Sequence, residues 1–182
     1  LAGLGYGATS YADGLSGAIH PVQAGSESMP AELLEARMPT LKKRFELVQD
    51  SGGPGRNRGG LATVSEFEFL GDGTTTVICE KTSKAAPRGL ESGRPAPYTN
   101  AVWLFKDTDR ELRLGKTAGT EIFRGDTVTV HPAGGGGYGD PLEREPERVL
   151  ADVDAGYVSL ESARDDYGVV IDAETLVVDA TA

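Results

Sequence analysis

The sequence predicts an α+β fold, with a mainly antiparallel β body, glycine-rich loops and a short C-terminal two-helix segment. Of 25 glycines, 23 precede residue 140, where they separate short runs of Val, Thr and Phe. Such runs between glycine turns are typical of antiparallel strands. The last 43 residues contain only Gly156 and Gly168, so this segment permits helices.

Three parts follow from this pattern. We expect residues 1–60 to be an incomplete N-terminal segment that ends in a glycine and arginine loop, residues 61–141 a β-rich body, and residues 142–182 an acidic helical tail with a final strand. The chain begins at Leu1 without a methionine, which suggests a cut end. Its 182 residues fit one domain with an extension, and packing alone can stabilise a core of this size.

The clearest strand of the body is predicted at Thr63–Leu70. Phe67 and Phe69 alternate with glutamates, as in a half-buried antiparallel strand. A Gly-Asp-Gly turn follows at 71–73, and Thr74–Thr82 is rich in β-branched residues. We therefore expect these two runs to form a hairpin with each other.

The rest of the body adds four short runs that bring the expected total to about six strands. Polar turns separate these runs, which are Thr99–Phe105, Glu111–Leu114, Thr120–Phe123 and Thr127–His131.

Two helices are predicted in the tail. Pro146 suits the first turn of a helix, because its missing N–H costs nothing there, and Gly156 ends that helix. Ser159 can cap a second helix, whose Leu160, Ala163 and Tyr167 share a face, and Gly168 supplies the left-handed stop before a strand at 169–171.

Charge and cysteine content exclude several classes of function. The net charge is −10, and residues 140–182 carry −9 of it, with twelve acids and three arginines. An acidic chain without a basic stripe is a poor nucleic-acid binder. The longest apolar run, at 101–105, is too short for a membrane span. The single cysteine, Cys79, excludes an intrachain disulfide and favours a reducing, cytoplasmic location.

The first glycine loop, residues 50–60, is a candidate binding site for a phosphate or carboxylate. Its backbone can adopt left-handed angles, so that N–H groups converge on an anion while Arg56 and Arg58 bind it through their guanidinium groups. The other candidate residues are Ser51, Gly52, Gly53, Gly59 and Gly60. The alternative, which composition favours, is a structural turn whose arginines satisfy buried carbonyls or an acidic neighbour. A serine protease is excluded because only fifty residues precede Ser51.

The second glycine loop, residues 132–141, contains four consecutive glycines. Such a run is entropically costly, so either another group approaches its backbone closely or it needs unusual angles. Gly135, Gly136, Tyr138 and Asp140 are candidate binding residues. In the alternative, the tyrosine is a packing residue and the aspartate caps the tail.

The small number of histidines limits which metal sites and proton-transfer sites the chain can form. The chain has only His20 and His131, without a His-Glu-x-x-His motif, so we assign no metal site to it. His20 is the better candidate for catalytic proton transfer.

In their order, the motifs of this chain resemble the C-terminal part of the hydantoinase B/oxoprolinase family. The matching segments are Pro30–Glu35 with Pro39, Arg44–Leu47, Asp50–Gly60, Gly134–Pro141, Gly156–Ser159 and Ala163–Gly168. The resemblance covers roughly residues 13–172, and family members are several times longer. The chain therefore looks like a C-terminal fragment or one product of a split chain. Members of the family often contain a His-x-His-x-x-Asn-like stretch. In this chain only the first position matches, as His20, and Val22 and Gly25 occupy the other two.

The resemblance implies the hydrolytic subunit of an ATP-dependent amidohydrolase that opens cyclic amides such as hydantoin or 5-oxoproline. An A-type partner subunit would bind ATP and phosphorylate the substrate carbonyl oxygen, and water would then attack the activated small molecule in a hetero-oligomer. Any metal ion would lie in the missing N-terminal portion. The chain alone would be inactive.

Two alternatives remain open at this point. One is a subunit of an acetone or acetophenone carboxylase, which are relatives of this family. The other is a non-catalytic assembly module, whose glycine loops are structural and whose acidic tail docks a partner.

Overall fold

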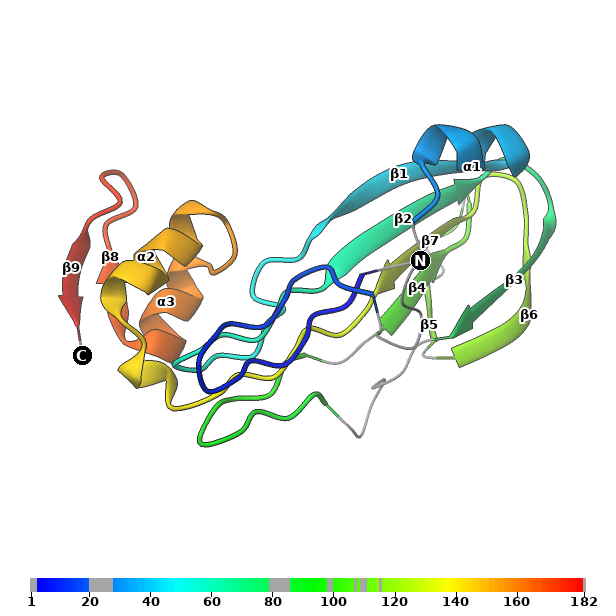
Figure 1. The fold of residues 1–182 in the computed structure, drawn as a ribbon. Coiled ribbons are helices and arrows are strands. Elements are labelled where there is room, and N and C mark those ends of the chain that lie inside the picture. Colours follow the sequence, from blue (N-terminus) through cyan, green and yellow to red (C-terminus); the bar gives the residue numbers. More distant parts are fainter. Residues whose placement is uncertain are drawn as a thin grey trace.

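The computed structural model describes residues 3–19, 28–78, 86–97, 100–106, 108, 111–114 and 116–181. A β body lies at one end of the molecule and a helical tail at the other, with long extended segments side by side between them (Figure 1). The predicted α+β architecture is therefore confirmed. None of the described helices is long and apolar enough to cross a membrane.

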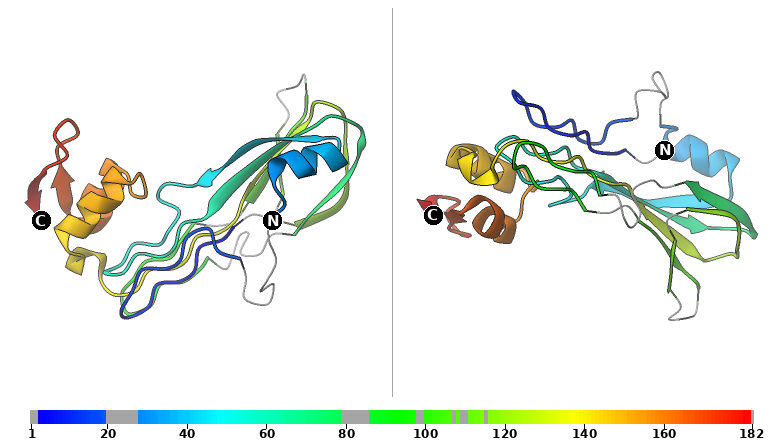
Figure 2. Two further views of the ribbon diagram at one scale, coloured as in Figure 1. Left: turned by 45° about the horizontal axis from the view of Figure 1, so that its top comes forward. Right: turned by 90° about the horizontal axis from the view of Figure 1, so that it is seen from below.

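A five-stranded antiparallel sheet forms most of the β body. Its order is β1-β2-β7-β4-β5, and helix α1 (Ala31–Arg37) lies beside the edge strand β1, as two further views show (Figure 2). The strands are β1 (Thr40–Leu47), β2 (Thr63–Phe69), β7 (Thr127–His131), β4 (Asn100–Leu104) and β5 (Glu111–Leu114). Phe69 and Val128 of this sheet form a small buried core with Ile122, against which Phe67 packs.

The predicted hairpin between the first two runs of the body is wrong. Strand β3 (Gly73–Ile78) pairs with β6 (Lys116–Ile122) in a separate two-stranded sheet. Strand β2 cannot accept β3, because β1 and β7 already occupy its two edges. The Phe69 N–H donates to the Asp126 carbonyl, and the Leu70 N–H to the Pro39 carbonyl, so the chain is held where it leaves the sheet.

The two helices of the tail and its strand at 169–171 follow the prediction, but that strand is not the final one, because a further strand at 178–181 pairs with it. It contains η2 (Pro141–Glu143), α2 (Pro146–Asp154), α3 (Leu160–Tyr167) and the strands β8 (Val169–Ile171) and β9 (Val178–Thr181). The Ser159 hydroxyl accepts the Ser162 N–H at 3.0 Å, and Gly168 ends α3 at φ 66°. The buried core of the tail consists of its own residues, Val149, Val158, Ala163, Tyr167, Val169 and Ile171.

Between these two cores lies a layer of extended backbone, which we call the glycine layer and define as residues 3–18, 51–61, 87–96 and 133–139. Its segments exchange backbone hydrogen bonds, such as Gly60 N–H to the Tyr6 carbonyl at 2.8 Å. Residues from both sides of the predicted boundary at 60 therefore pack in one layer. The division of the chain at residues 60 and 141 stays a prediction.

Candidate functional site

The two glycine loops lie against each other in the glycine layer. The Gly53 N–H donates to the Gly135 carbonyl at 2.8 Å, and the Gly135 N–H to the Gly60 carbonyl at 2.9 Å. Asn57 and Tyr138 exchange a pair of backbone hydrogen bonds, both of 2.9 Å. The candidate residues of the two loops are thus brought together. The remaining candidate, His20, lies outside the described residues.

Close backbone approach explains why these segments need glycine. A Cβ atom on Gly59 would lie 1.8 Å from the Gly135 carbonyl oxygen, and one on Gly135 would lie 1.8 Å from the Tyr6 carbonyl oxygen. The same steric reason restricts the crowded axis of collagen to glycine. The glycines of the first loop, at 52, 53, 55, 59 and 60, all lack positive φ, and left-handed backbone occurs only at Asp50 among the residues of this loop, with φ 58°.

Five backbone donors of the first loop point at carbonyl oxygens of the layer, those of Gly53, Arg56, Asn57, Gly59 and Gly60, and the Arg58 N–H donates to the Asp13 carboxylate. The Gly59 N–H donates to Gly53 and the Gly60 N–H to Tyr6, at 2.9 and 2.8 Å. The Ser51 hydroxyl donates to the Val48 carbonyl at 2.6 Å and accepts the Ala62 N–H at 2.9 Å. Gly52 is buried with them, and a Cβ atom there would lie 2.2 Å from the Gly59 carbonyl oxygen. This geometry corresponds to a structural turn.

Arg58 lies inside the molecule and binds protein groups. Its Nε and Nη2 atoms donate to the two carboxylate oxygens of Asp152 at 3.0 and 3.2 Å, and Nη1 donates to the Gly59 carbonyl at 2.9 Å. Only 6% of the Arg58 side chain is exposed. Its surroundings match the alternative in which the arginine satisfies a carbonyl and an acidic neighbour.

Arg56, in contrast, keeps 45% of its side chain exposed and makes a long ion pair with Glu143 at 3.7 Å. Tyr138 is half-buried, and Gly136 beside it is buried. The Asp140 carboxylate accepts the Leu142 N–H at 3.0 Å and caps η2, as the alternative interpretation proposed. Arg56 is therefore the guanidinium of the first loop that solvent reaches.

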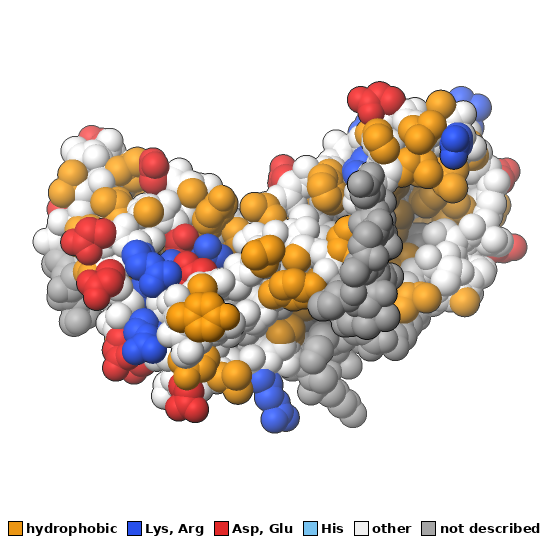
Figure 3. Space-filling model, viewed as in Figure 1, with side chains coloured by type: hydrophobic (Ala, Val, Ile, Leu, Met, Phe, Trp, Pro, Cys, Tyr) orange, Lys and Arg blue, Asp and Glu red, His pale blue; other side chains and the backbone are white. Residues whose placement is uncertain are grey.

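A cluster of charged side chains joins the glycine layer to the tail, and among them only Arg58 was a candidate residue from the sequence. We call it the charge network and define it as Asp13, Arg58, Arg144, Arg148 and Asp152. Arg144 donates to both carboxylate oxygens of Asp13, at 2.8 and 2.9 Å, and to Asp152 at 2.7 Å. Arg148 pairs with Asp13 at 2.9 Å. In the view of Figure 3, basic and acidic side chains gather where the tail meets the layer.

The charge network perturbs the ionisation of its members. Burial alone would raise the pKa of Asp13, but the hydrogen bonds and charge of Arg144, the Arg58 N–H and the Arg148 charge outweigh it and lower that pKa. Beside the network, burial raises the pKa of the Tyr167 phenol, against the opposing effect of the Arg144 and Arg58 charges. The sequence held one signal of the network, since Asp152 follows Val149 by three residues and so lies near the apolar face of its helix.

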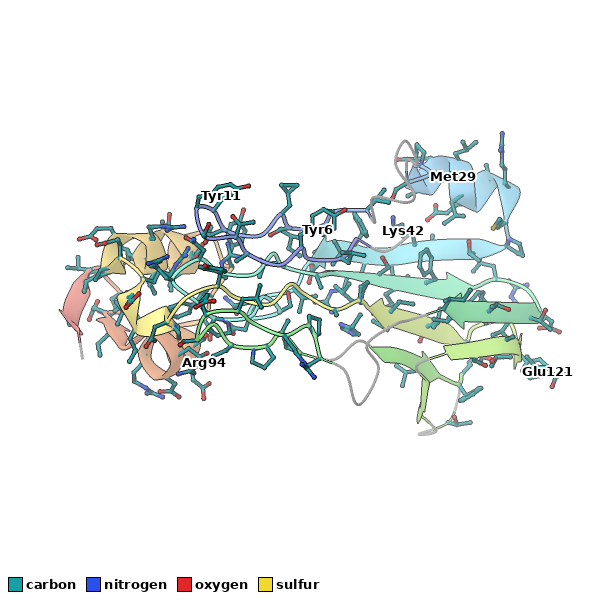
Figure 4. The ribbon with its side chains drawn as sticks, turned by 60° about the horizontal axis from the view of Figure 1, so that its bottom comes forward. Tyr6, Tyr11, Met29, Lys42, Arg94 and Glu121 are labelled. Carbon is teal, nitrogen blue, oxygen red and sulfur yellow. The ribbon has the colours of Figure 1, made fainter. Side chains whose placement is uncertain are left out.

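An open groove of about 620 Å³ lies where the glycine layer meets α3. Asp50, Pro54 and the segment 94–97 line one wall, and Ser159, Glu161, Ser162, Asp165 and Asp166 line the other. Arg94 pairs with Asp166 and lies next to α3 (Figure 4). Four carboxylates against one guanidinium make this groove unsuited to a phosphorylated anion. Within the described ranges, no group of three or more His, Cys, Asp or Glu side chains gathers for a metal ion.

An extended glycine layer between a β sheet and a small helical unit defines one architectural class, and comparison with known proteins gives its family. Residues 1–141 match the family model described as hydantoinase B/oxoprolinase. The chain belongs to this family, as the resemblance of its motifs predicted.

The relatives and solved structures agree with this assignment. The chain is 34% identical over 167 residues to the B-type subunit of a putative D-/L-hydantoinase from Pseudomonas sp. (strain NS671), covering 91% of this chain and 28% of that protein. It is 38% identical over 156 residues to the beta chain of the caprolactamase from Pseudomonas jessenii, covering 78% and 25%. The chain thus spans about a quarter of the length of these curated relatives.

Two solved structures share the fold. The crystal structure of the ATP-dependent caprolactamase from Pseudomonas jessenii matches with a TM-score of 0.81 and 35% identity, covering 93% of this chain and 30% of that one. A nucleotide-free acetone carboxylase structure matches with a TM-score of 0.77 and 26% identity, covering 97% and 28%. The fold is therefore common to an amide hydrolase and a carboxylase.

Proposed function

We propose that this chain is the C-terminal region of the hydrolytic B-type subunit of a cytoplasmic, ATP-dependent enzyme that opens cyclic amides. The observation that carries this proposal is the match to caprolactamase over 93% of the chain at 35% identity. The matches to the B-type subunit of a hydantoinase and to 5-oxoprolinases support the same substrate class, a ring amide.

In the proposed reaction an A-type partner binds ATP and transfers its terminal phosphoryl group to the amide oxygen of the substrate, releasing ADP. Water then adds to the activated carbon and the ring C–N bond breaks, which leaves an acyl phosphate. A second water attacks the acyl carbon, and phosphate leaves with the former amide oxygen. Phosphorylation is needed because an amide oxygen is a poor leaving group. The products are the ring-opened acid, ADP and phosphate.

Within this subunit we propose that the glycine layer is a scaffold. The backbone donors of Gly53, Gly59, Gly60 and Gly135 bind carbonyl groups of the layer, and Arg58 binds Asp152. Arg56, half-exposed at the edge of the layer, is the residue of the first loop that we propose for contact with an anionic group. An accessible surface of 10374 Å², against roughly 8,400 Å² for a compact monomer of this mass, supports packing against other polypeptide.

The test uses the complete B-type polypeptide that contains this region, assembled with its A-type partner. ATP, hydantoin, 5-oxoproline and caprolactam are supplied in turn, and ADP and the ring-opened acid are measured with and without bicarbonate. We expect both products from at least one ring amide, in equal amounts and without bicarbonate. The 182-residue chain alone, as a control, should form neither product.

The acetone carboxylase match makes a carboxylase the second candidate. This candidate predicts that ADP formation with a ketone substrate depends on bicarbonate and that no ring amide is opened. Such a result would overturn the hydrolase proposal.

A further inference from the structure

The tail has an apolar core of its own. We call residues 141–181 the tail module. Its buried apolar cluster includes Val149, Ala163 and Val169, all from the module, whereas the cluster of the sheet is built from Phe69, Ile122 and Val128. Each core is therefore complete without side chains from the other.

Polar groups carry the contacts that the tail module makes with the glycine layer and with residues 49–50 just before it. The Asp50 N–H donates to the Tyr157 carbonyl at 3.0 Å, and the Ser159 N–H donates to the Asp50 carboxylate at 2.9 Å. Gln49 donates to the Val158 carbonyl at 3.3 Å. The charge network supplies the remaining strong contacts, with Asp13 and Arg58 on the layer and Arg144, Arg148 and Asp152 on the module.

A junction of this kind is weaker than an apolar interface. Buried ion pairs offset much of their mutual attraction by the loss of hydration, so water competes well for the same groups when they separate. Among the described residues, the buried Arg144 Nε also has no hydrogen-bond partner. This further reduces the free energy that is gained when the junction closes. The groove already opens along this boundary, and the Arg94–Asp166 pair crosses it.

We infer that the tail module separates from the glycine layer as an intact folded unit, and that the charge network is the contact that holds it closed. The module is joined to the layer by one chain connection, at Gly139 and Asp140, where Gly139 adopts φ 76°. Separation widens the groove into a cleft with Asp50 on one wall and Ser159 on the other. This inference does not depend on the reaction that the complete enzyme catalyses.

Native-state hydrogen exchange followed by NMR on the 182-residue chain tests it. The amides of Asp50 and Ser159 report the junction, those of Ala163 and Gly168 report the tail module, and that of Gly135 reports the layer. In the unmodified chain we expect the junction amides to exchange through an opening that depends less on urea than exchange at the other amides does. With Asp152→Asn we expect junction exchange to become at least tenfold faster and to stay faster than exchange at Ala163, Gly168 and Gly135, whose dependence on urea does not change.

Asp165→Asn is the matched control, because it removes a carboxylate of α3 that pairs with Arg164 on the surface. It should leave the junction amides unchanged. If Asp152→Asn does not fold, Asp13→Asn replaces it, since the Asp13 side chain is 27% exposed and tolerates the change better. The inference fails if the junction amides exchange with the same rate and the same dependence on urea as the other reporter amides, or if they accelerate no more than in the control.

Discussion

At the residue scale, the two arginines of the first glycine loop show how neighbours decide the role of a side chain. Arg58 is enclosed by Asp152 and the Gly59 carbonyl, whereas Arg56, two residues away, reaches solvent. Both have the same side chain and glycine-rich surroundings in the sequence. Their environments differ because Arg58 faces Asp152. The local sequence does not show this, since Asp152 lies 94 residues away along the chain.

Arg58→Ala should therefore destabilise the fold, because it leaves the buried Asp152 carboxylate with one partner fewer. Removing one member of a buried ion pair costs about 3 kcal/mol. Arg56→Ala, the matched control, should cost less than about 1 kcal/mol, as for other exposed pairs. Urea denaturation followed by circular dichroism measures both values. Equal costs for the two variants would contradict the roles that we assign.

Gly59→Ala should also destabilise the chain, because a Cβ atom there would lie 1.8 Å from a backbone oxygen. Displacing the neighbouring segment costs about 3 kcal/mol. Gly7→Ala is the control, since its nearest neighbour, the Gly136 carbonyl oxygen, would lie at 3.8 Å, and the expected change is below about 0.5 kcal/mol. Thermal unfolding of the two variants compares them; a stable Gly59→Ala variant would show that the layer is loosely packed.

At the element scale, the tail could be predicted and parts of the sheet could not. Local signals define the tail helices, with Pro146 in the first turn of one and Ser159 and Gly168 capping the other. Strand β1 was missed because its Lys-Lys-Arg run at 42–44 hides the alternation, and a register shift between Lys42 and Arg44 interrupts it further. The partner of β3 was wrong because a turn does not determine which strand a run pairs with.

Ser159→Ala tests the cap that made α3 predictable. The variant loses the acceptor of the Ser162 N–H, which costs about 1 kcal/mol. Ser159→Thr keeps a hydroxyl acceptor at the same place without adding a charge beside Asp50, and should remain within a few tenths of the original stability. The two midpoints of urea unfolding are compared. Equal losses in both variants would assign the effect to packing and not to the cap.

At the scale of the whole molecule, charged and polar contacts connect the tail module to the glycine layer, whereas apolar packing stabilises each core. The candidate anion site was only partly predictable, because the glycine spacing indicated close backbone approach but not which group approaches. The neighbours of Gly135, for example, come from residues 6 and 60. Such contacts between distant segments leave no local pattern in the sequence.

The charge network makes stability depend on pH. The pKa of Asp13 is lower in the folded chain, so its contribution is present above the unfolded value of about 3.9 and is lost as pH falls through the folded value. The unfolding free energy should therefore decrease at acid pH, and we call this decrease the acid limb. Asp13→Asn should make the acid limb less steep, as measured by urea titrations between pH 2 and 6. Glu32→Gln, an exposed change in α1, is the control and should retain the limb. An identical limb in the Asp13 variant would exclude this carboxylate as the cause.

The central claim is that the backbone amides of the two glycine loops form a closed scaffold and do not themselves bind an anion. Hydrogen exchange of the Gly53, Gly59, Gly60 and Gly135 amides, with and without inorganic phosphate, measures this most directly. We expect protection on the order of 1,000-fold for all four, and no change in their chemical shifts with phosphate. Unprotected amides whose chemical shifts move as phosphate is added would contradict the account.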